Sequence, residues 1–244
     1  MRVDDVAGNE TGSHRSPRRR MPCVSSNEAP ECLSRTRRAI SARPHLEVLM
    51  WARELGCPWD PGMCQAAARG GHLEVLQWAR EQGCPWGETC QSAAKGGHLE
   101  VLQWARDRGC LWDESTCSRA AMGGHLEVLQ WARAHDCPWD ASTCKLAASG
   151  GHLEVLKWAR AHRSPWDEDT VNEAITKGHL EVLMWLLEHG CSCLAMCETA
   201  AAYEHLDILQ WLREHDCSWD ENVCEAAARN GHLEVGWCTF LATS

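Results

Sequence analysis

The stretch GGHLEVLQWAR, residues 96–106, decides the fold because its core, HLEVL, returns along the chain at a short and nearly constant interval. Copies or variants of HLEVL begin at eight histidines: His45, His72, His98, His125, His152, His179, His205 and His232. Successive histidines lie 26 or 27 residues apart. A fixed period of this length is typical of a solenoid, in which each unit buries its apolar face only against its neighbours. The period therefore predicts an elongated array and not one compact core.

Each unit is predicted to contain a short first helix, best seen in CLWDESTCSRAAMGG, residues 110–124. Asp113 is a natural N-cap, because its carboxylate can accept from free amides of the first helical turn. Trp112 and Cys117 then occupy the two positions of a hydrophobic staple. Gly123 and Gly124 end the helix, since glycine adopts the left-handed conformation without steric penalty.

A second helix is predicted from His125 to about His135. Leu126, Val128, Leu129, Trp131 and Ala132 cover a wide arc of its surface, broader than the apolar stripe of an ordinary surface helix. So wide an arc fits a helix that is packed by its own unit and by neighbours on both sides. The predicted fold class is therefore all-α, a helical-repeat solenoid of stacked antiparallel helix pairs.

This helix–Gly-Gly–helix unit resembles the ankyrin repeat. The resemblance is carried by Ala93, Ala94, the run GHLEVL at 97–102, and the glycine that closes the second helix, and it covers about residues 45–235. It implies stacked helix pairs and a protein-binding function. Ankyrin units have about 33 residues, so these units are similar to short repeats that lack the projecting β-hairpin. The family's TPLH tetrapeptide is replaced by residues 115–118, STCS.

The array is expected to have distinct ends. Residues 1–31 are polar and rich in arginine, and we expect a disordered basic N-terminal segment. Residues 32–235 form the array, with a worn polar cap before His45 and about seven helix pairs. Residues 236–244 depart from the repeat, and we expect an irregular, frayed tail.

The charge of the chain favours a protein partner. The formal net charge is -10; residues 1–44 carry nine Arg against five acidic residues, or +4, which leaves -14 for the rest. An acidic array repels phosphate, so we expect no binding to nucleic acid. A partner with a basic face suits the array better.

The location is predicted from what the sequence lacks. No stretch approaches the roughly 18 apolar residues of a membrane-spanning helix, and the N-terminus has no apolar signal core. We therefore expect a monomer in the cytoplasm that makes no membrane contact. The run RSPRRR, residues 15–20, makes the nucleus an alternative, although a solvated charge run is its plainer interpretation.

The 16 cysteines suggest metal or redox chemistry, and most fall at two phases of the repeat. Zinc ligands are usually two to four residues apart, whereas five or six residues separate these cysteines. Equivalent helices stack about 8–10 Å apart, too far for a disulfide, but a bridge within a unit, such as Cys110–Cys117, is geometrically possible. We predict that the cysteines act as small buried apolar residues. A metal-binding or redox-responsive array is the alternative function.

No enzyme signature is visible. The chain has no phosphate-binding glycine loop, no H-E-x-x-H motif and no nucleophile elbow. We expect the repeated histidines to satisfy backbone carbonyls and not to bind metal. Catalytic residues, cofactors and metal ligands are therefore predicted to be absent.

The predicted function is a non-enzymatic scaffold for protein–protein interaction, which binds through its concave first-helix and turn face. Positions that vary between otherwise copied units are the best signal for the contact residues. On the first helix these candidate protein-binding residues are Gln65, Gln91, Ser118, Arg119, Lys145, Leu146, Asn172, Glu173 and Glu198.

Overall fold

The computed structural model describes residues 46–54, 60–191, 196–215 and 221–232 of the 244. Within those residues all regular secondary structure is helical, which confirms the predicted all-α class. The first helices of the units are α3 (Pro61–Arg69), α5 (Thr89–Gly96), α7 (Glu114–Met122), α9 (Ala141–Ser149), α11 (Glu168–Thr176), α13 (Met196–Ala202) and α15 (Glu221–Asn230). The second helices are α2 (Leu46–Glu54), α4 (Leu73–Glu81), α6 (Leu99–Asp107), α8 (Leu126–Ala134), α10 (Leu153–Ala161), α12 (Leu180–Glu188) and α14 (Leu206–Glu214).

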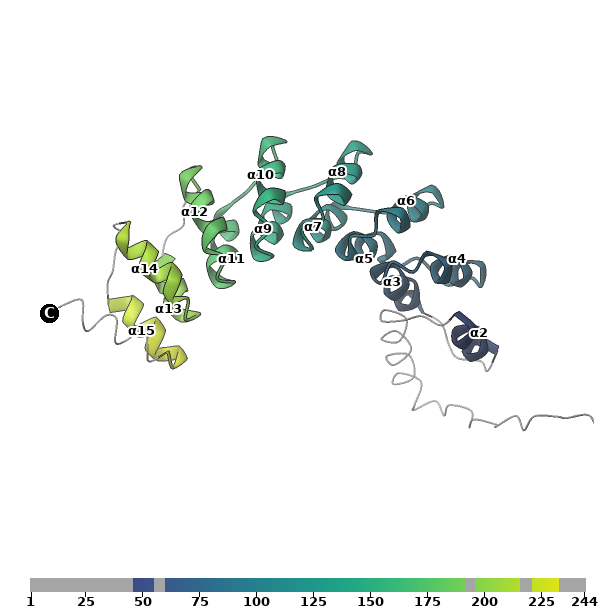
Figure 1. The fold of residues 1–244 in the computed structure, drawn as a ribbon, viewed down its shortest axis with the longest axis horizontal. Helices are drawn as coiled ribbons and strands as arrows, with labels where there is room; N and C mark the ends of the chain where they lie inside the picture. The colour runs from purple at the N-terminus through teal and green to yellow at the C-terminus, as the bar shows by residue number, and fades with distance from the viewer. Residues whose placement is uncertain (1–45, 55–59, 192–195, 216–220, 233–244) are drawn as a thin grey trace, which may run out of the picture.

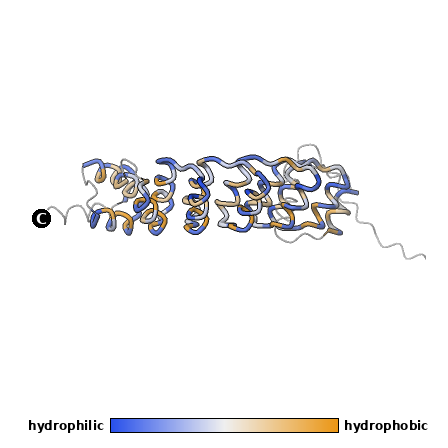
Figure 2. Tube along the Cα trace, turned by 90° about the horizontal axis from the view of Figure 1, so that it is seen from above, coloured by the Kyte–Doolittle hydropathy of each residue, from blue (hydrophilic) through white to orange (hydrophobic). Residues whose placement is uncertain are grey.

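The helix pairs stack side by side into an arc (Figure 1). Each first helix packs against the first helices before and after it, and against its own second helix. From α3 to α13 the first helices line the inner side of the arc, and the second helices form its outer side. Seen from above, hydrophobic and hydrophilic segments alternate along the whole length of the array (Figure 2). The expected solenoid of antiparallel helix pairs is therefore confirmed.

The core is a row of copied positions. The second leucine of each HLEVL run is fully buried, as at Leu102, Leu129 and Leu156. The alanine pair of each first helix, such as Ala120 and Ala121, is also fully buried. Alanine at these positions lets neighbouring first helices approach closely, and each buried leucine side chain contributes about 2 kcal/mol of hydrophobic stabilisation.

The predicted caps are present in the central units. The carboxylate of Asp113 accepts from the amide of Ser115 at 3.1 Å, and that of Asp140 accepts from the amide of Ser142 at 3.0 Å. Asp167 forms a capping box with Thr170. Such caps stabilise a helix by about 1 kcal/mol each.

Histidine links each unit to the one before it. The imidazole Nε2 of His125 lies 3.1 Å from the carbonyl oxygen of Lys95, and His152 contacts the Met122 carbonyl at the same distance. These carbonyls lie near the end of the preceding first helix, where the helix leaves acceptors without an internal partner. The prediction that the repeated histidines satisfy carbonyls is confirmed.

Several expectations fall on other parts of the chain. The predicted disordered segment 1–31, the worn cap before His45 and the tail 236–244 lie outside the described residues. In the parts of the chain that the structure describes, no helix is both long enough and apolar enough to cross a bilayer.

Candidate interaction surface

The predicted contact residues lie on the first helices, and most are partly accessible. Arg119 is exposed, whereas the side chain of Ser118 is buried. The residues that are half-buried are Gln65, Gln91, Lys145, Leu146, Asn172, Glu173 and Glu198. Since six of the nine residues share one helical position, they recur along the array once per unit.

Ser118 does not fit the predicted surface. Its hydroxyl donates to the carbonyl of Ser115 at 3.2 Å, and only 4% of the residue is exposed. Variation between units marked this position as a contact residue, but here it reflects local packing. Ser118 is therefore left out of the surface considered below.

Two members of this row bridge neighbouring units. The amide Nε2 of Gln91 donates to the Asp113 carboxylate at 3.0 Å, and Lys145 Nζ lies 2.7 Å from Asp169 Oδ2. Each bridge joins one first helix to the N-terminal end of the next. The row is therefore a continuous strip along the inner side of the arc, which we call the inner strip: residues 65, 91, 119, 145, 146, 172, 173 and 198.

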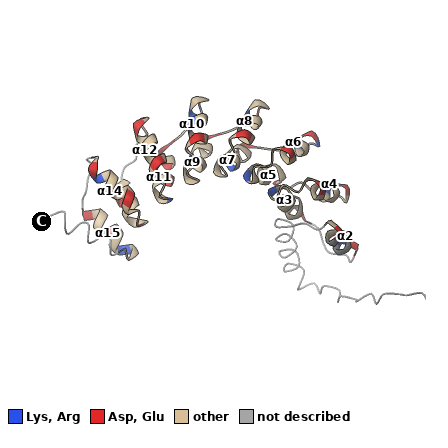
Figure 3. Ribbon diagram, in the orientation of Figure 1, with Lys and Arg blue, Asp and Glu red and all other residues tan. Residues whose placement is uncertain are grey.

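The inner strip is most acidic at α11. Asp167, Glu168 and Asp169 are exposed around its first turn, and Glu173 lies one turn further on. Acidic residues occur along the whole arc (Figure 3). Hydrogen bonding with Asp169 raises the pKa of Lys145. Lys145 is the only cation with a printed ion pair to this group, so the first turn of α11 keeps a net negative charge.

A second ordered feature is an Arg–Trp–Trp ladder on the side of the second helices. The Arg106 guanidinium lies 4.0 Å from the ring centroid of Trp112, and Trp112 meets Trp131 edge-on at 5.8 Å. Arg106 Nη1 also donates to the Cys110 carbonyl at 2.7 Å. The same triad recurs at Arg80–Trp86–Trp104, Arg133–Trp139–Trp158 and Arg160–Trp166–Trp185.

Sequence reasoning missed this ladder, although a signal for it exists. Arginine six residues before the loop tryptophan is present in each copy that keeps the Trp-Asp or Trp-Gly pair. In the unit without that tryptophan, the arginine is replaced by Leu187. The two residues are therefore lost together, as expected for side chains that contact each other.

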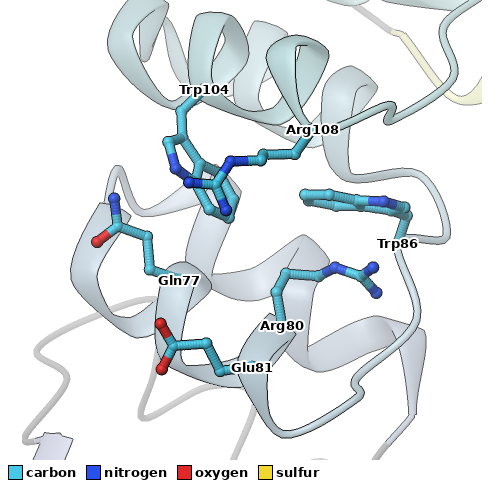
Figure 4. A pocket seen from close by; sticks show the side chains of 6 residues that line it. All are labelled: Gln77, Arg80, Glu81, Trp86, Trp104 and Arg108. Carbon is cyan, nitrogen blue, oxygen red and sulfur yellow. The ribbon is translucent and has the colours of Figure 1, made fainter.

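A pocket of about 390 Å³ opens on the ladder between α4 and α6 (Figure 4). Gln77, Arg80 and Glu81 line it from α4, and Trp86, Trp104 and Arg108 form the other side. Arg80 lies over Trp86 and also donates to the Cys84 carbonyl, and Arg108 lies 5.3 Å from the Trp104 ring. Since both guanidinium groups already contact indole rings, we interpret the pocket walls as part of the ladder.

The cysteine thiols are arranged differently from the expected register. Within the described residues nine are buried and only Cys224 is exposed, so the prediction of buried cysteines is confirmed for those nine. The thiol that hydrogen-bonds to Cys117 is that of Cys137, and the one that hydrogen-bonds to Cys110 is that of Cys90. The predicted Cys110–Cys117 pairing is therefore wrong. In these described parts of the chain, no group of three or more His, Cys, Asp or Glu is arranged to hold a metal ion.

Comparisons with known proteins agree with this geometry. Residues 117–160 match the family model described as ankyrin repeats (many copies). The human ASB11 ankyrin repeat domain is similar in fold, with a TM-score of 0.52 and 17% sequence identity over 64% of this chain and 84% of that one. No curated protein matches the chain.

The fold defines a protein of the helical-repeat solenoid class. Its units are ankyrin repeats, and they are of the short type, because their period is 26 or 27 residues and the described units contain no hairpin strands. Ankyrin-repeat proteins are generally scaffolds that bind other proteins and are generally not enzymes.

Proposed function

We propose that this chain is a non-enzymatic scaffold that binds another protein through its concave first-helix and turn face. The observation that carries the proposal is the inner strip. Its side chains vary from unit to unit and are partly accessible, while the positions around them are copied and buried. A rigid frame that presents a row of variable side chains is suited to recognising one extended protein surface.

The proposed partner has a basic face. Residues 45–244 carry a formal charge of -14, and the carboxylates of Asp167, Glu168 and Glu173 gather on α11. Opposite charge on the partner would speed association and would exclude acidic competitors. Because salt screens exposed charges beyond about 8 Å at physiological ionic strength, the affinity should fall as salt is added.

The proposal places a monomer in the cytoplasm or the nucleus and assigns it no catalysis. Polar side chains that could act as acids or bases, such as His98 and Asp113, recur at equivalent positions of several units. A catalytic site needs one unique arrangement of such groups. A redox-responsive array is the second candidate function, and it is supported by the hydrogen-bonded thiol pairs.

Affinity capture with two charge-matched variants tests the proposal. The inner variant carries Glu168→Lys and Glu173→Lys; the control carries Glu100→Lys and Glu127→Lys, which change exposed residues of the second helices by the same charge. We expect one protein to be retained by the wild type and the control and reduced at least about tenfold by the inner variant, a loss of roughly 1.4 kcal/mol. Equal loss in both variants, or no protein retained above background at any salt concentration, would overturn the proposal.

A further inference from the structure

Buried thiols meet in pairs within the first three described helix pairs. Cys64 Sγ lies 3.9 Å from the carbonyl oxygen of Cys84, and the two thiols share a hydrogen bond. Cys117 Sγ lies 3.9 Å from the Cys137 carbonyl, and these thiols also share a hydrogen bond. In each case a first-helix cysteine meets the cysteine that follows the second helix, 20 residues later.

The loop cysteine is held in place from the other side. Cys84 Sγ donates to the Asp60 carbonyl at 3.3 Å, and Cys137 Sγ donates to the Asp113 carbonyl at 3.5 Å. Both carbonyls belong to the N-cap residue of the first helix in the same pair. The thiol is therefore fixed against the start of that helix, beside its cysteine partner.

We propose that Cys64–Cys84, Cys90–Cys110 and Cys117–Cys137 are oxidation sites that close to disulfides and lock α3 to α4, α5 to α6, and α7 to α8. The pairing register is defined by the helix hairpin, because the C-terminal end of the second helix lies beside the N-terminal end of the first. This locking does not depend on the proposed partner. It would stiffen the first half of the array and leave the next two helix pairs unlocked.

The next two helix pairs break the register and serve as internal controls. Twenty residues after Cys144 stands Ser164, and 20 residues before Cys191 stands Val171. Cys144 and Cys191 are as deeply placed as the paired thiols, at 0% and 7% exposed. Burial is therefore similar, but the register partner is missing.

The chemistry balances with a peroxide as the two-electron oxidant. The Cys84 thiolate attacks the O–O bond of hydrogen peroxide, giving a sulfenic acid at Cys84 and releasing hydroxide. The Cys64 sulfur then attacks the sulfenic sulfur, so the S–S bond forms as the S–O bond breaks. In total two thiols and one peroxide give one disulfide and two waters.

The electrostatic environment favours a thiolate at the loop position in two of the pairs. The hydrogen bond from Cys64 lowers the pKa of Cys84 to about 7, and that from Cys90 lowers the pKa of Cys110. The first-helix partners shift the other way, since the same hydrogen bonds and burial raise the pKa of Cys64 and Cys90. The thiolate is the reactive nucleophile, so attack on peroxide should begin at Cys84 and Cys110.

Disulfide mapping of the full chain tests the proposal. The reduced chain is incubated with hydrogen peroxide near neutral pH for increasing times, the remaining thiols are alkylated, and proteolytic peptides are mapped without reduction. We expect linked peptides that join 64 to 84, 90 to 110 and 117 to 137, with Cys144 and Cys191 recovered alkylated. Because the thiols are buried, closure should be slow and should speed up with temperature below the unfolding transition.

A matched variant keeps the test independent of folding. Cys84→Ser reproduces the residue that the chain itself carries at 164, so the hairpin should tolerate it. This variant should lose the 64–84 link, leave Cys64 alkylated and keep the other two links. Oxidation should also raise the thermal midpoint of the wild type more than that of the variant. Linkage of Cys110 to Cys117, equal linkage of Cys144 or Cys191, or thiols that stay reduced just below the midpoint would each overturn the proposal.

Discussion

Gly97 lies directly against the imidazole of His125, so that a Cβ on Gly97 would come within 2.5 Å of the ring atoms Cε1 and Nδ1. The same imidazole reaches the Lys95 carbonyl in the preceding first helix. The contact recurs between the second glycine and the next histidine at Gly71–His98, Gly124–His152, Gly151–His179 and Gly178–His205. The Gly-Gly pair therefore ends a helix and also makes room for the histidine that ties the next unit to it.

Substitution of Gly97 should be costly for this reason. Gly97→Ala places a side chain at φ +77° and against His125, whereas Gly109→Ala meets φ +81° alone, with nothing within 4 Å of the new Cβ. We expect Gly109→Ala to lower the free energy of unfolding by about 1 kcal/mol and Gly97→Ala by roughly 3 kcal/mol. Urea unfolding followed by circular dichroism measures both. Equal losses would show that the histidine contact contributes nothing.

The converse substitution should stabilise the array. Asp136 and Arg163 have φ of 60° and 67° at the loop position where other units have Gly83, Gly109 and Gly190. Arg163→Gly should raise the free energy of unfolding by about 1 kcal/mol, and Asp136→Gly by somewhat less, because aspartate tolerates this conformation better. A thermal melt of each variant measures the effect. A lower midpoint for Arg163→Gly would show that its side chain makes a contact worth more than the backbone strain.

The Arg–Trp–Trp ladder should contribute measurably to stability. Arg106→Ala removes the hydrogen bond to the Cys110 carbonyl and the guanidinium over Trp112, and we expect a loss of about 2 kcal/mol in the free energy of unfolding. Arg106→Lys should recover only part of it, since an ammonium group cannot stack as a plane. The control Arg119→Ala changes an exposed residue of α7 and should cost under about 0.5 kcal/mol. Similar effects for Arg106 and Arg119 would rule out a stabilising ladder.

The histidine row should make the array sensitive to mild acid. Burial lowers the pKa of His98 and His152 from 6.5, and neighbouring histidines lower it further. The unfolded chain therefore binds protons more tightly than the folded chain at these positions. Stability should be complete above about pH 6.5 and should fall as the pH drops through the lowered folded values. His152→Gln should flatten the decline in unfolding midpoint between pH 7 and 5.5, whereas His162→Gln, at an exposed histidine, should not.

Much of the fold follows from residues that act locally or by simple repetition. The HLEVL period gave the number and direction of the helices, Asp113 and Asp140 act as caps as expected, and His125 bonds to a carbonyl as expected. These features depend on the short range of helical hydrogen bonding and on one apolar face per helix. Periodicity alone is enough to detect them.

The contacts between different positions of neighbouring helices were not predictable in the same way. The distance argument for cysteines compared equivalent positions of stacked helices, whereas Cys117 meets Cys137 at a different position of its own hairpin. Ser118 varies between units as a contact residue would, yet it is buried. A repeat period shows which residues are copies of one another, but it does not fix which side chains meet, because that depends on helix rotation and crossing.

The central claim is that each helix pair is stabilised by its immediate neighbours alone, so that one pair can be removed without loss of the fold. Deleting residues 125–151, which joins Gly124 to His152 and restores the repeat, tests it by urea unfolding followed by circular dichroism. We predict a shorter chain that is still folded, with helical signal reduced by about one unit and a lower unfolding midpoint. A deletion variant with no cooperative unfolding transition and no helical signal would contradict the account.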